Sequence, residues 1–186
     1  AIYKALAFIS VRKLVQDSSS IKKDLYAITY ADVYDLAVAL VSLVWNGVDD
    51  AIDADFFDKI RTNLGEIKVL REGSIGEVDM LTVASDTFVV PTWEQVLKGV
   101  TYADAIRVVL LWTGVDEEKL DQPVKAITDK LLVNFGRIEI LDYKYLSSFE
   151  MVADGITLRE IVDLIQYVVN AIAGTDYDIT TMFAEE

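Results

Sequence analysis

The chain has 186 residues and a formal net charge of −14, from 31 acidic and 17 basic side chains. It contains no histidine and no cysteine, so disulfides, imidazole or thiolate metal sites, and Ser-His-Asp or Cys-His catalysis all lack their atoms. Hydrophobic residues make up 53% of the chain, with only 2 prolines and 9 glycines. This composition is typical of a folded domain and excludes a disordered acidic chain.

The charge is unevenly distributed along the chain. Residues 1–30 carry five basic and two acidic side chains, a net charge of +3, and the remainder carries 12 basic and 29 acidic ones, a net charge of −17. This asymmetry is typical of a basic segment that seeks a negative partner, although a charge of +3 can equally serve to solvate a helix. The acidic body repels phosphate, so nucleic acid is not an expected partner of it.

No membrane or export segment is predicted. The longest apolar run, residues 36–45, spans ten residues, whereas a membrane-spanning helix needs about 20. Lys4, Arg12 and Lys13 interrupt the apolar residues near the N-terminus, which excludes a signal-type core there. The expected location is inside a cell or within a particle.

The first segment, residues 1–27, is predicted to be a basic arm for assembly. Apolar residues at positions 2, 6 and 9 favour a helix slightly over a strand, and three serines at 18–20 separate this segment from the body. We expect the arm to contact a neighbouring protein subunit, either of the same chain or of another. The predicted interface residues are Ile2, Leu6, Phe8, Ile9, Arg12 and Lys13.

Helix starts and stops recur along the chain. A threonine followed three residues later by an acidic residue or glutamine can form a capping box, in which each residue bonds the other's backbone N–H. A glycine after the helix suits the left-handed conformation that closes many helices. The predicted boxes are Thr29 with Asp32, Thr92 with Gln95, Thr101 with Asp104, and Thr157 with Glu160; the closing glycines are Gly47, Gly99, Gly114 and Gly174.

The spacing of these boxes argues against an internal repeat. The first, third and fourth boxes lie 72 and 56 residues apart, and the sequences between them do not align. True repeats keep a fixed period. The pattern therefore favours shared helix-end chemistry over duplication.

Two helices are predicted to form the centre of the core. Residues 33–45 and 105–112 are apolar nearly all round, and a helix without a polar face is normally surrounded by protein. Amphipathic helices are expected at 54–64, 122–135 and 158–173, the first with Asp53 as its cap. The residues expected to be almost fully buried are Leu36, Leu40, Val44, Ile106, Val109 and Leu110.

Three segments resemble strands. Residues 67–70 and 80–90 flank a glycine-containing turn at 72–76, and residues 137–149 alternate in part and are rich in tyrosine and isoleucine. The predicted fold class is therefore mostly α with a minor β element (α+β). We expect residues 28–186 to form a single acidic domain around two buried central helices, 33–45 and 105–112.

A cluster of aspartates suggests a cation site. Asp49, Asp50, Asp53 and Asp55 follow a predicted helix end, where the helix dipole is already negative. Ca²⁺ would offset this charge, because it binds carboxylate and carbonyl oxygens. The cluster lacks the glycine and glutamate of an EF-hand loop. The competing interpretation is helix capping, with Asp53 and Asp116 as natural N-caps.

The tryptophans leave two interpretations open. Trp45 and Trp112 end the two apolar helices, and Trp93 opens a short one. Residues of such large area usually pack in the core. Alternatively, these tryptophans anchor a partner subunit, since Trp is enriched in binding hot spots.

The sequence predicts a non-enzymatic structural or interaction protein, one subunit of a larger homo- or hetero-oligomeric assembly. A virion or filament component has this combination of high apolar content, high charge and missing catalytic residue types. The alternative is an acidic domain that binds Ca²⁺ or another small ligand. Apart from Ca²⁺ in that alternative, no cofactor is expected.

Overall fold

The computed structural model describes residues 23–74, 87–176 and 178. Its contacts divide the chain into two compact units, Ala1–Val100 and Thr101–Glu186. The predicted interface residues of the N-terminal arm lie outside the described residues. That residues 28–186 form a single domain stays a prediction.

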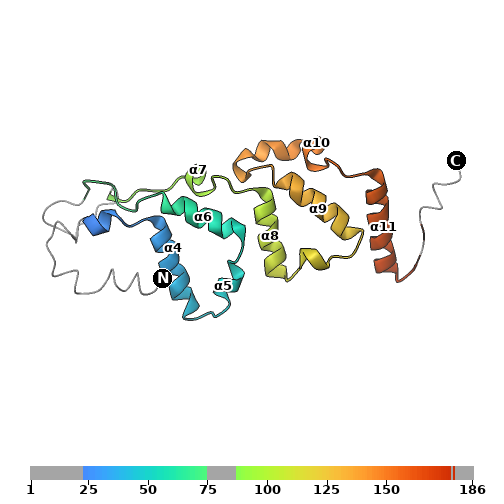
Figure 1. Ribbon diagram of the computed structural model, residues 1–186, viewed down its shortest axis with the longest axis horizontal. Coiled ribbons are helices and arrows are strands. Elements are labelled where there is room, and N and C mark those ends of the chain that lie inside the picture. Colours follow the sequence, from blue (N-terminus) through green and yellow to red (C-terminus); the bar gives the residue numbers. More distant parts are fainter. Residues whose placement is uncertain (1–22, 75–86, 177, 179–186) are drawn as a thin grey trace. The chain divides into compact units, whose positions relative to one another are not determined.

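The first unit is built on a pair of helices. Its described elements include α4 (Tyr30–Ser42), α5 (Val48–Ala51), α6 (Asp55–Gly65) and α7 (Trp93–Val96). Helix α4 packs on both α5 and α6, and α6 packs on α7 (Figure 1). The short α5 therefore packs beside one helix of this pair, α4.

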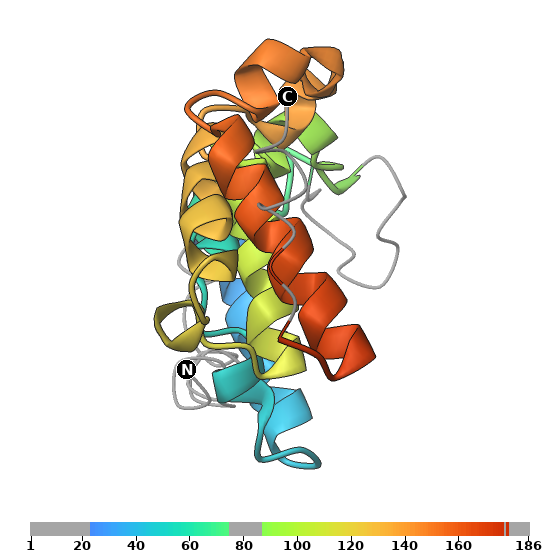
Figure 2. The ribbon, with the colours of Figure 1, turned by 90° about the vertical axis from the view of Figure 1, so that its right-hand side faces the viewer.

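The second unit is built on three longer helices. Its elements are α8 (Tyr102–Thr113), η2 (Glu117–Lys119), α9 (Val124–Phe135), η3 (Ile140–Ser147), α10 (Phe149–Val152) and α11 (Leu158–Ala173). Helix α9 packs on α8, on α10 and on α11. The yellow-orange α9 and the red α11 can be followed in Figure 2. Both units are helical, as the sequence predicted.

The predicted helix starts are confirmed. Each box closes through the backbone N–H of its threonine, which donates to the side chain three residues later. The distances are 2.9 Å from Thr29 N to Asp32 Oδ2, 2.9 Å from Thr92 N to Gln95 Oε1, 2.8 Å from Thr101 N to Asp104 Oδ2 and 2.8 Å from Thr157 N to Glu160 Oε2. We call Thr29, Thr101 and Thr157 the cap threonines, and α4, α8 and α11 the first helices.

The closing glycines behave as predicted in two of these helices. Gly114 and Gly174 end α8 and α11 with φ of 72° and 63°, in the left-handed region. The prediction is wrong for Gly47, whose φ is −88° and which precedes α5. Helix α4 ends earlier, where Leu43 keeps right-handed geometry and donates its N–H to Leu40 O at 3.2 Å. The chain thus leaves α4 without needing a left-handed residue.

The expectation of two buried central helices is wrong. Leu40 is 57% exposed and Val109 is 58% exposed, and Val44 is also exposed. Leu36, Ile106 and Leu110 are only half-buried. An apolar sequence shows that a helix is hydrophobic, but it does not show which other elements pack against it. Each of these helices keeps an outward side that no described element covers. The most deeply buried apolar residues are instead Val100, Ile138, Ala103, Leu132, Ala39, Val48 and Val108.

The predicted β element is also not present in the described residues. They contain isolated antiparallel bridges only, which join Thr29 to Lys68, Leu70 to Phe88, and Thr101 to Glu139. The bridges of Thr29 and Thr101 do not extend into strands because the chain enters α4, α8 or η3 at the very next residue. Much of the expected strand at 137–149 is therefore the 3₁₀ helix η3. Residues 80–86 of the other expected strand lie outside the described part.

The two units contain equivalent backbone hydrogen bonds at the starts of α4 and α8. In the first, Tyr30 N donates to Ile67 O at 2.9 Å, just after α6. In the second, Tyr102 N donates to Ile138 O at 3.0 Å, just after α9. We call α6 and α9 the second helices. Helices α4 and α8 are thus fixed at their starts to the segments that leave α6 and α9.

An asparagine near the end of each second helix forms a clamp. Asn63 Nδ2 donates to the carbonyls of Val96 and Lys98 at 2.9 and 2.8 Å. Asn134 Nδ2 donates to the carbonyls two residues apart after α10, Val152 at 2.8 Å and Asp154 at 2.9 Å. The clamp holds the short helix, α7 or α10, whose chain continues into the next first helix.

A small-residue contact also recurs. A Cβ added at Gly65 would lie 3.6 Å from the Cβ of Ala31, and one added at Gly136 would lie 3.8 Å from that of Ala103. Gly99 and Gly155, after the two short helices, share a φ of 73°. With the clamp and the bridge, these matches show that the chain is a tandem structural repeat, which corrects the expectation from spacing. The repeats span 28–99 and 100–155, and α11 stands where a third begins.

Candidate interaction surface

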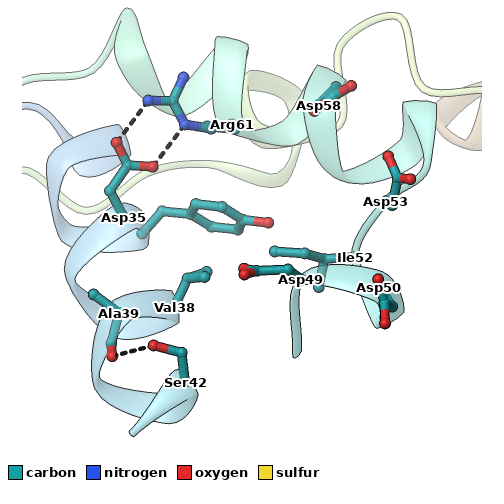
Figure 3. A pocket seen from close by; sticks show the side chains of 11 residues that line it. Asp35, Val38, Ala39, Ser42, Asp49, Asp50, Ile52, Asp53, Asp58 and Arg61 are labelled. Carbon is teal, nitrogen blue, oxygen red and sulfur yellow. Dashed lines mark hydrogen bonds and ion pairs between the residues drawn. The ribbon is translucent and has the colours of Figure 1, made fainter. Parts of the chain in front are cut away.

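The predicted aspartate cluster lies beside a hollow of about 650 Å³ in the first unit. Figure 3 shows Asp49 reaching from α5 toward α4, and Asp53 and Asp58 lying by the start of α6. The lining residues are Tyr34, Asp35, Val38, Ala39, Ser42, Asp49, Asp50, Ile52, Asp53, Asp58 and Arg61. Three of the four predicted ligands thus share the hollow, and Asp55 does not line it.

One wall of the hollow is closed by an ion pair. Arg61 donates from Nε to Asp35 Oδ1 and from Nη2 to Asp35 Oδ2, both at 2.6 Å (Figure 3). The hydrogen bond and the charge of Asp35 raise the pKa of Arg61. Burial, followed by the charge of Asp58, raises the pKa of Tyr34. The wall therefore holds a fixed charge pair beside a neutral phenol.

The hollow does not form a ready cation site. Within the described residues, no three acidic side chains converge closely enough to hold a metal ion. An ion near Asp49 or Asp53 would have to complete its coordination with backbone carbonyl oxygens or water. The capping interpretation is confirmed for Asp116, whose Oδ1 accepts from Glu118 N at 3.0 Å. It is wrong for Asp53, because Ala54 is the N-cap of α6.

A lysine ties α9 to the start of α11. Lys130 Nζ donates to the two carboxylate oxygens of Glu160 at 2.6 and 2.7 Å, and to Gly155 O at 2.6 Å. The hydrogen bond from Lys130 to the Glu160 carboxylate, together with that from the Thr157 N–H, lowers the pKa of Glu160. The same carboxylate therefore caps α11 and anchors it to the preceding repeat.

The feature that all three first helices share is an exposed apolar stripe, which we call the outer stripe. It occupies positions 4, 8 and 11 after the cap threonine in all three helices, and position 15 after Thr29 and Thr157 only, because position 15 after Thr101 is the acidic Asp116. All its members are exposed except Ala105, which is half-buried. They are Val33, Ala37, Leu40 and Val44 in the first repeat, Ala105, Val109 and Trp112 in the second, and Ile161, Ile165, Val168 and Ile172 on α11.

The spacing of the outer stripe indicates its use. Apolar residues at alternating steps of four and three form the narrow seam by which helices pair. Contiguous exposed apolar surface of this kind marks an interaction site in soluble proteins. The stripe lies away from the second helix, so the packing within a repeat leaves it open.

The opposite side of α11 differs from that of the other first helices. Where α4 has Ala31 and Val38 against its second helix, α11 has Arg159 and Gln166. Arg159 Nε donates to Asp163 Oδ1 on the same helix at 3.3 Å. Helix α11 is therefore polar on the side that meets a second helix in the earlier repeats, while its outer stripe remains apolar.

The three tryptophans are exposed. Trp112 lies in the outer stripe and is 64% exposed, and Trp93 on α7 is 73% exposed. Trp45 follows α4 and is also exposed. These exposures are inconsistent with core packing, and the alternative, in which the tryptophans anchor a partner subunit, stays a prediction.

Sequence reasoning missed the outer stripe as a site. Aligning the chain on the three cap threonines places the stripe residues in register, and that signal was present in the sequence. The unequal spacing of the boxes, 72 and 56 residues, hides this register.

Comparisons with known proteins add no family to this description: no protein-family model, no curated protein and no solved structure matches the chain. Within the described part of the chain, no helix is both long enough and apolar enough to cross a membrane.

Proposed function

We propose that this protein is a non-enzymatic structural subunit that joins a larger assembly of protein subunits through its outer stripe. The observation that carries the proposal is the repetition of exposed apolar residues at equal positions of three first helices, at Leu40, Trp112 and Val168 for example. A residue exposed once can be incidental, whereas the same position exposed in each repeat points to a use.

The construction of the repeats supports this proposal. The capping boxes and the asparagine clamps fix the helices before any partner arrives. Binding to a preformed helix therefore carries little ordering cost. The chain also lacks histidine and cysteine, the residues most often used for acid–base and nucleophilic catalysis. A scaffold role needs none of them.

A matched pair of tryptophan variants tests the proposal. Trp112→Glu places a charge in the outer stripe, and Trp93→Glu places the same charge at another largely exposed position outside it. We expect Trp112→Glu to reduce the mass of the assembly in light scattering, with unchanged helical circular dichroism, and Trp93→Glu to leave the mass unchanged. Equal effects of the two variants would contradict a specific role for the stripe.

The basic arm, residues 1–27, provides a second contact in this proposal. Its charge of +3 against −17 on the rest of the chain favours contact with the acidic body of a neighbouring subunit. Deleting residues 1–17 should give a folded, smaller and more soluble species. Assembly through the arm should weaken as salt shortens the Debye length from about 30 to about 3 Å. Unfolding of the deletion variant would show instead that the segment is part of the core.

The alternative function is Ca²⁺ binding, and the observation that favours it is that Asp49, Asp50 and Asp53 line one hollow. If they bind Ca²⁺, millimolar Ca²⁺ should raise the melting temperature by mass action. The variant Asp50→Asn should abolish this rise, and Asp142→Asn, an exposed acid far along the chain, should not. No shift and no heat of binding at about ten millimolar Ca²⁺ would exclude this alternative.

A further inference from the structure

Helix α11 carries the longest outer stripe of the described chain. Leu158 begins the helix on the same side as the stripe, so that the apolar positions are 158, 161, 165, 168 and 172. They follow one another at steps of three and four, and all five are exposed, Leu158 at 77%. They span nearly the whole of Leu158–Ala173. A seam of this period and length fits another helix lying along it.

The residues that flank this seam carry no charge. Val162 and Val169 border it on one side, and Leu164 and Ala171 border it on the other. In paired helices, charges at such flanking positions select the partner and its orientation, and like charges there keep identical helices apart. The flanks of α11 therefore permit pairing with an identical helix.

The acidic residues of α11 lie away from the seam and are already engaged. Glu160 accepts from Lys130 Nζ at 2.6 Å, and Asp163 pairs with Arg159 at 3.3 Å. Residues 160 and 163 lie on the side of the helix opposite the seam, as the helical period of 3.6 requires. A basic partner, including the arm with Arg12 and Lys13, would find no free carboxylate along the seam of α11.

We propose that α11 of one chain packs along α11 of a second copy, seam to seam, about a two-fold axis. This inference rests on the proposed function, because it names the partner of one outer stripe. Where the two helices run parallel, equivalent positions of the seam face each other, so the central residue Ile165 meets its own counterpart. The uncharged seam allows two chains of net charge −14 to approach with their acidic groups turned outward.

The salt dependence of this pair is opposite to that expected for the arm. Two like-charged chains repel at long range, and salt screens that repulsion while leaving apolar contact intact. The α11 pair should therefore strengthen from low to high salt, whereas an arm on an acidic body should weaken. Sedimentation velocity of the full chain, across a series of salt concentrations, separates the two modes.

A pair of single-charge variants tests the seam directly. Ile165→Glu adds an acid at the centre of the seam, and Gln166→Glu adds the same charge to the polar side of the same helix. Ile165→Glu should weaken the dimer about tenfold or more, as expected at the centre of an interface, and Gln166→Glu should leave it unchanged. Circular dichroism and thermal melting of both variants establish that they remain folded.

Because the chain has no cysteine, Ile165→Cys introduces a unique thiol. Under mild oxidation this variant should form a disulfide-linked dimer, and Arg159→Cys, on the polar side, should not. A chain that assembles but is indifferent to Ile165→Glu and gives no Ile165→Cys dimer overturns this inference and leaves the proposed function standing. A chain that is monomeric at every concentration and salt overturns this inference together with the homo-oligomeric form of the proposed function.

Discussion

The first and second repeats reach the same local arrangement through connections of different length. Asn63 precedes Thr92 by 29 residues, whereas Asn134 precedes the equivalent Ser148 by 14. Both asparagines nevertheless clamp two carbonyls of the short helix and its exit. The cost of closing a loop grows only slowly with its length. The comparison teaches that a few backbone bonds, and not a constant period, define this repeat.

The two repeats differ in how they fill equivalent positions. Counted from the asparagine clamps, Arg61 of α6 corresponds to Leu132 of α9. Arg61 pairs with Asp35 at the rim of the hollow, with its side chain 49% exposed, while Leu132 is only 4% exposed. One repeat thus uses an ion pair at a position where the other uses apolar packing.

The largest expected effect comes from this difference. Leu132→Ala should lower the free energy of unfolding by about 2–5 kcal/mol, because it leaves a cavity in a buried site. Arg61→Ala should cost only about 0–1 kcal/mol, because the exposed ion pair is screened by water. Urea denaturation of both variants measures the contrast. Equal costs would mean that the ion pair is part of a core and not of a rim.

Because the outer stripe is exposed, we expect that shortening one of its side chains lowers the free energy of unfolding only slightly. Leu40→Ala should lower the free energy of unfolding by less than about 1 kcal/mol, because its side chain keeps most of its contact with water in the folded state. A cost comparable to that of Leu132→Ala would show that another surface covers Leu40 in solution.

The asparagine clamps give the next largest contrast. Asn134 is 3% exposed, so Asn134→Ala leaves two carbonyls without a donor and should cost about 2–4 kcal/mol. Asn63 is half-buried, and water can replace its bonds in Asn63→Ala, which should cost about 1–2 kcal/mol. Amide hydrogen exchange of α7 and α10 should show which short helix each variant loosens. An undisturbed α10 in Asn134→Ala would contradict the clamp.

The left-handed glycines should behave alike in both repeats. Gly99 and Gly155 have the same φ of 73°, and an added Cβ would meet no atom within 4 Å at either position. Gly99→Ala and Gly155→Ala should therefore each cost about 1 kcal/mol, from backbone strain alone. Gly65→Ala serves as the control, since Gly65 is helical and its added Cβ makes an ordinary contact at 3.6 Å. Unequal costs for Gly99 and Gly155 would show that the repeats differ there.

The smallest effect concerns the pH dependence of the second unit. Lys130 and the Thr157 N–H hold the pKa of Glu160 below its ordinary value of 4.5. The charged form is favoured in the folded state, so this stabilisation is present above pH 4.5 and is lost as the pH falls through the lowered pKa. Glu160→Gln should flatten that part of the stability curve, measured by thermal melting from neutral to acidic pH. An unchanged acidic limb would assign the pH dependence to other carboxylates.

The sequence by itself determined the ends of the helices. The threonine boxes at 29, 92, 101 and 157 and the left-handed glycines at 114 and 174 depend on residues three or four positions apart. Such short-range chemistry is the same in any tertiary context. The helical class and the span of α11, residues 158–173, followed from the same local signals and from the apolar period.

Only the tertiary structure decided what those helices cover. Leu40 and Val109 belong to apolar segments, yet they are exposed, while Asn134 and Asp104 are polar and buried. The repeat is defined by backbone hydrogen bonds, such as Tyr30 N to Ile67 O and Tyr102 N to Ile138 O. Such bonds place little constraint on which side chains occupy these positions. The hydrogen bonds that define the repeat join residues 18 to 37 positions apart, and the connections between them vary in length. A sequence pattern cannot predict such contacts, because the tertiary packing of the helices decides which residues meet.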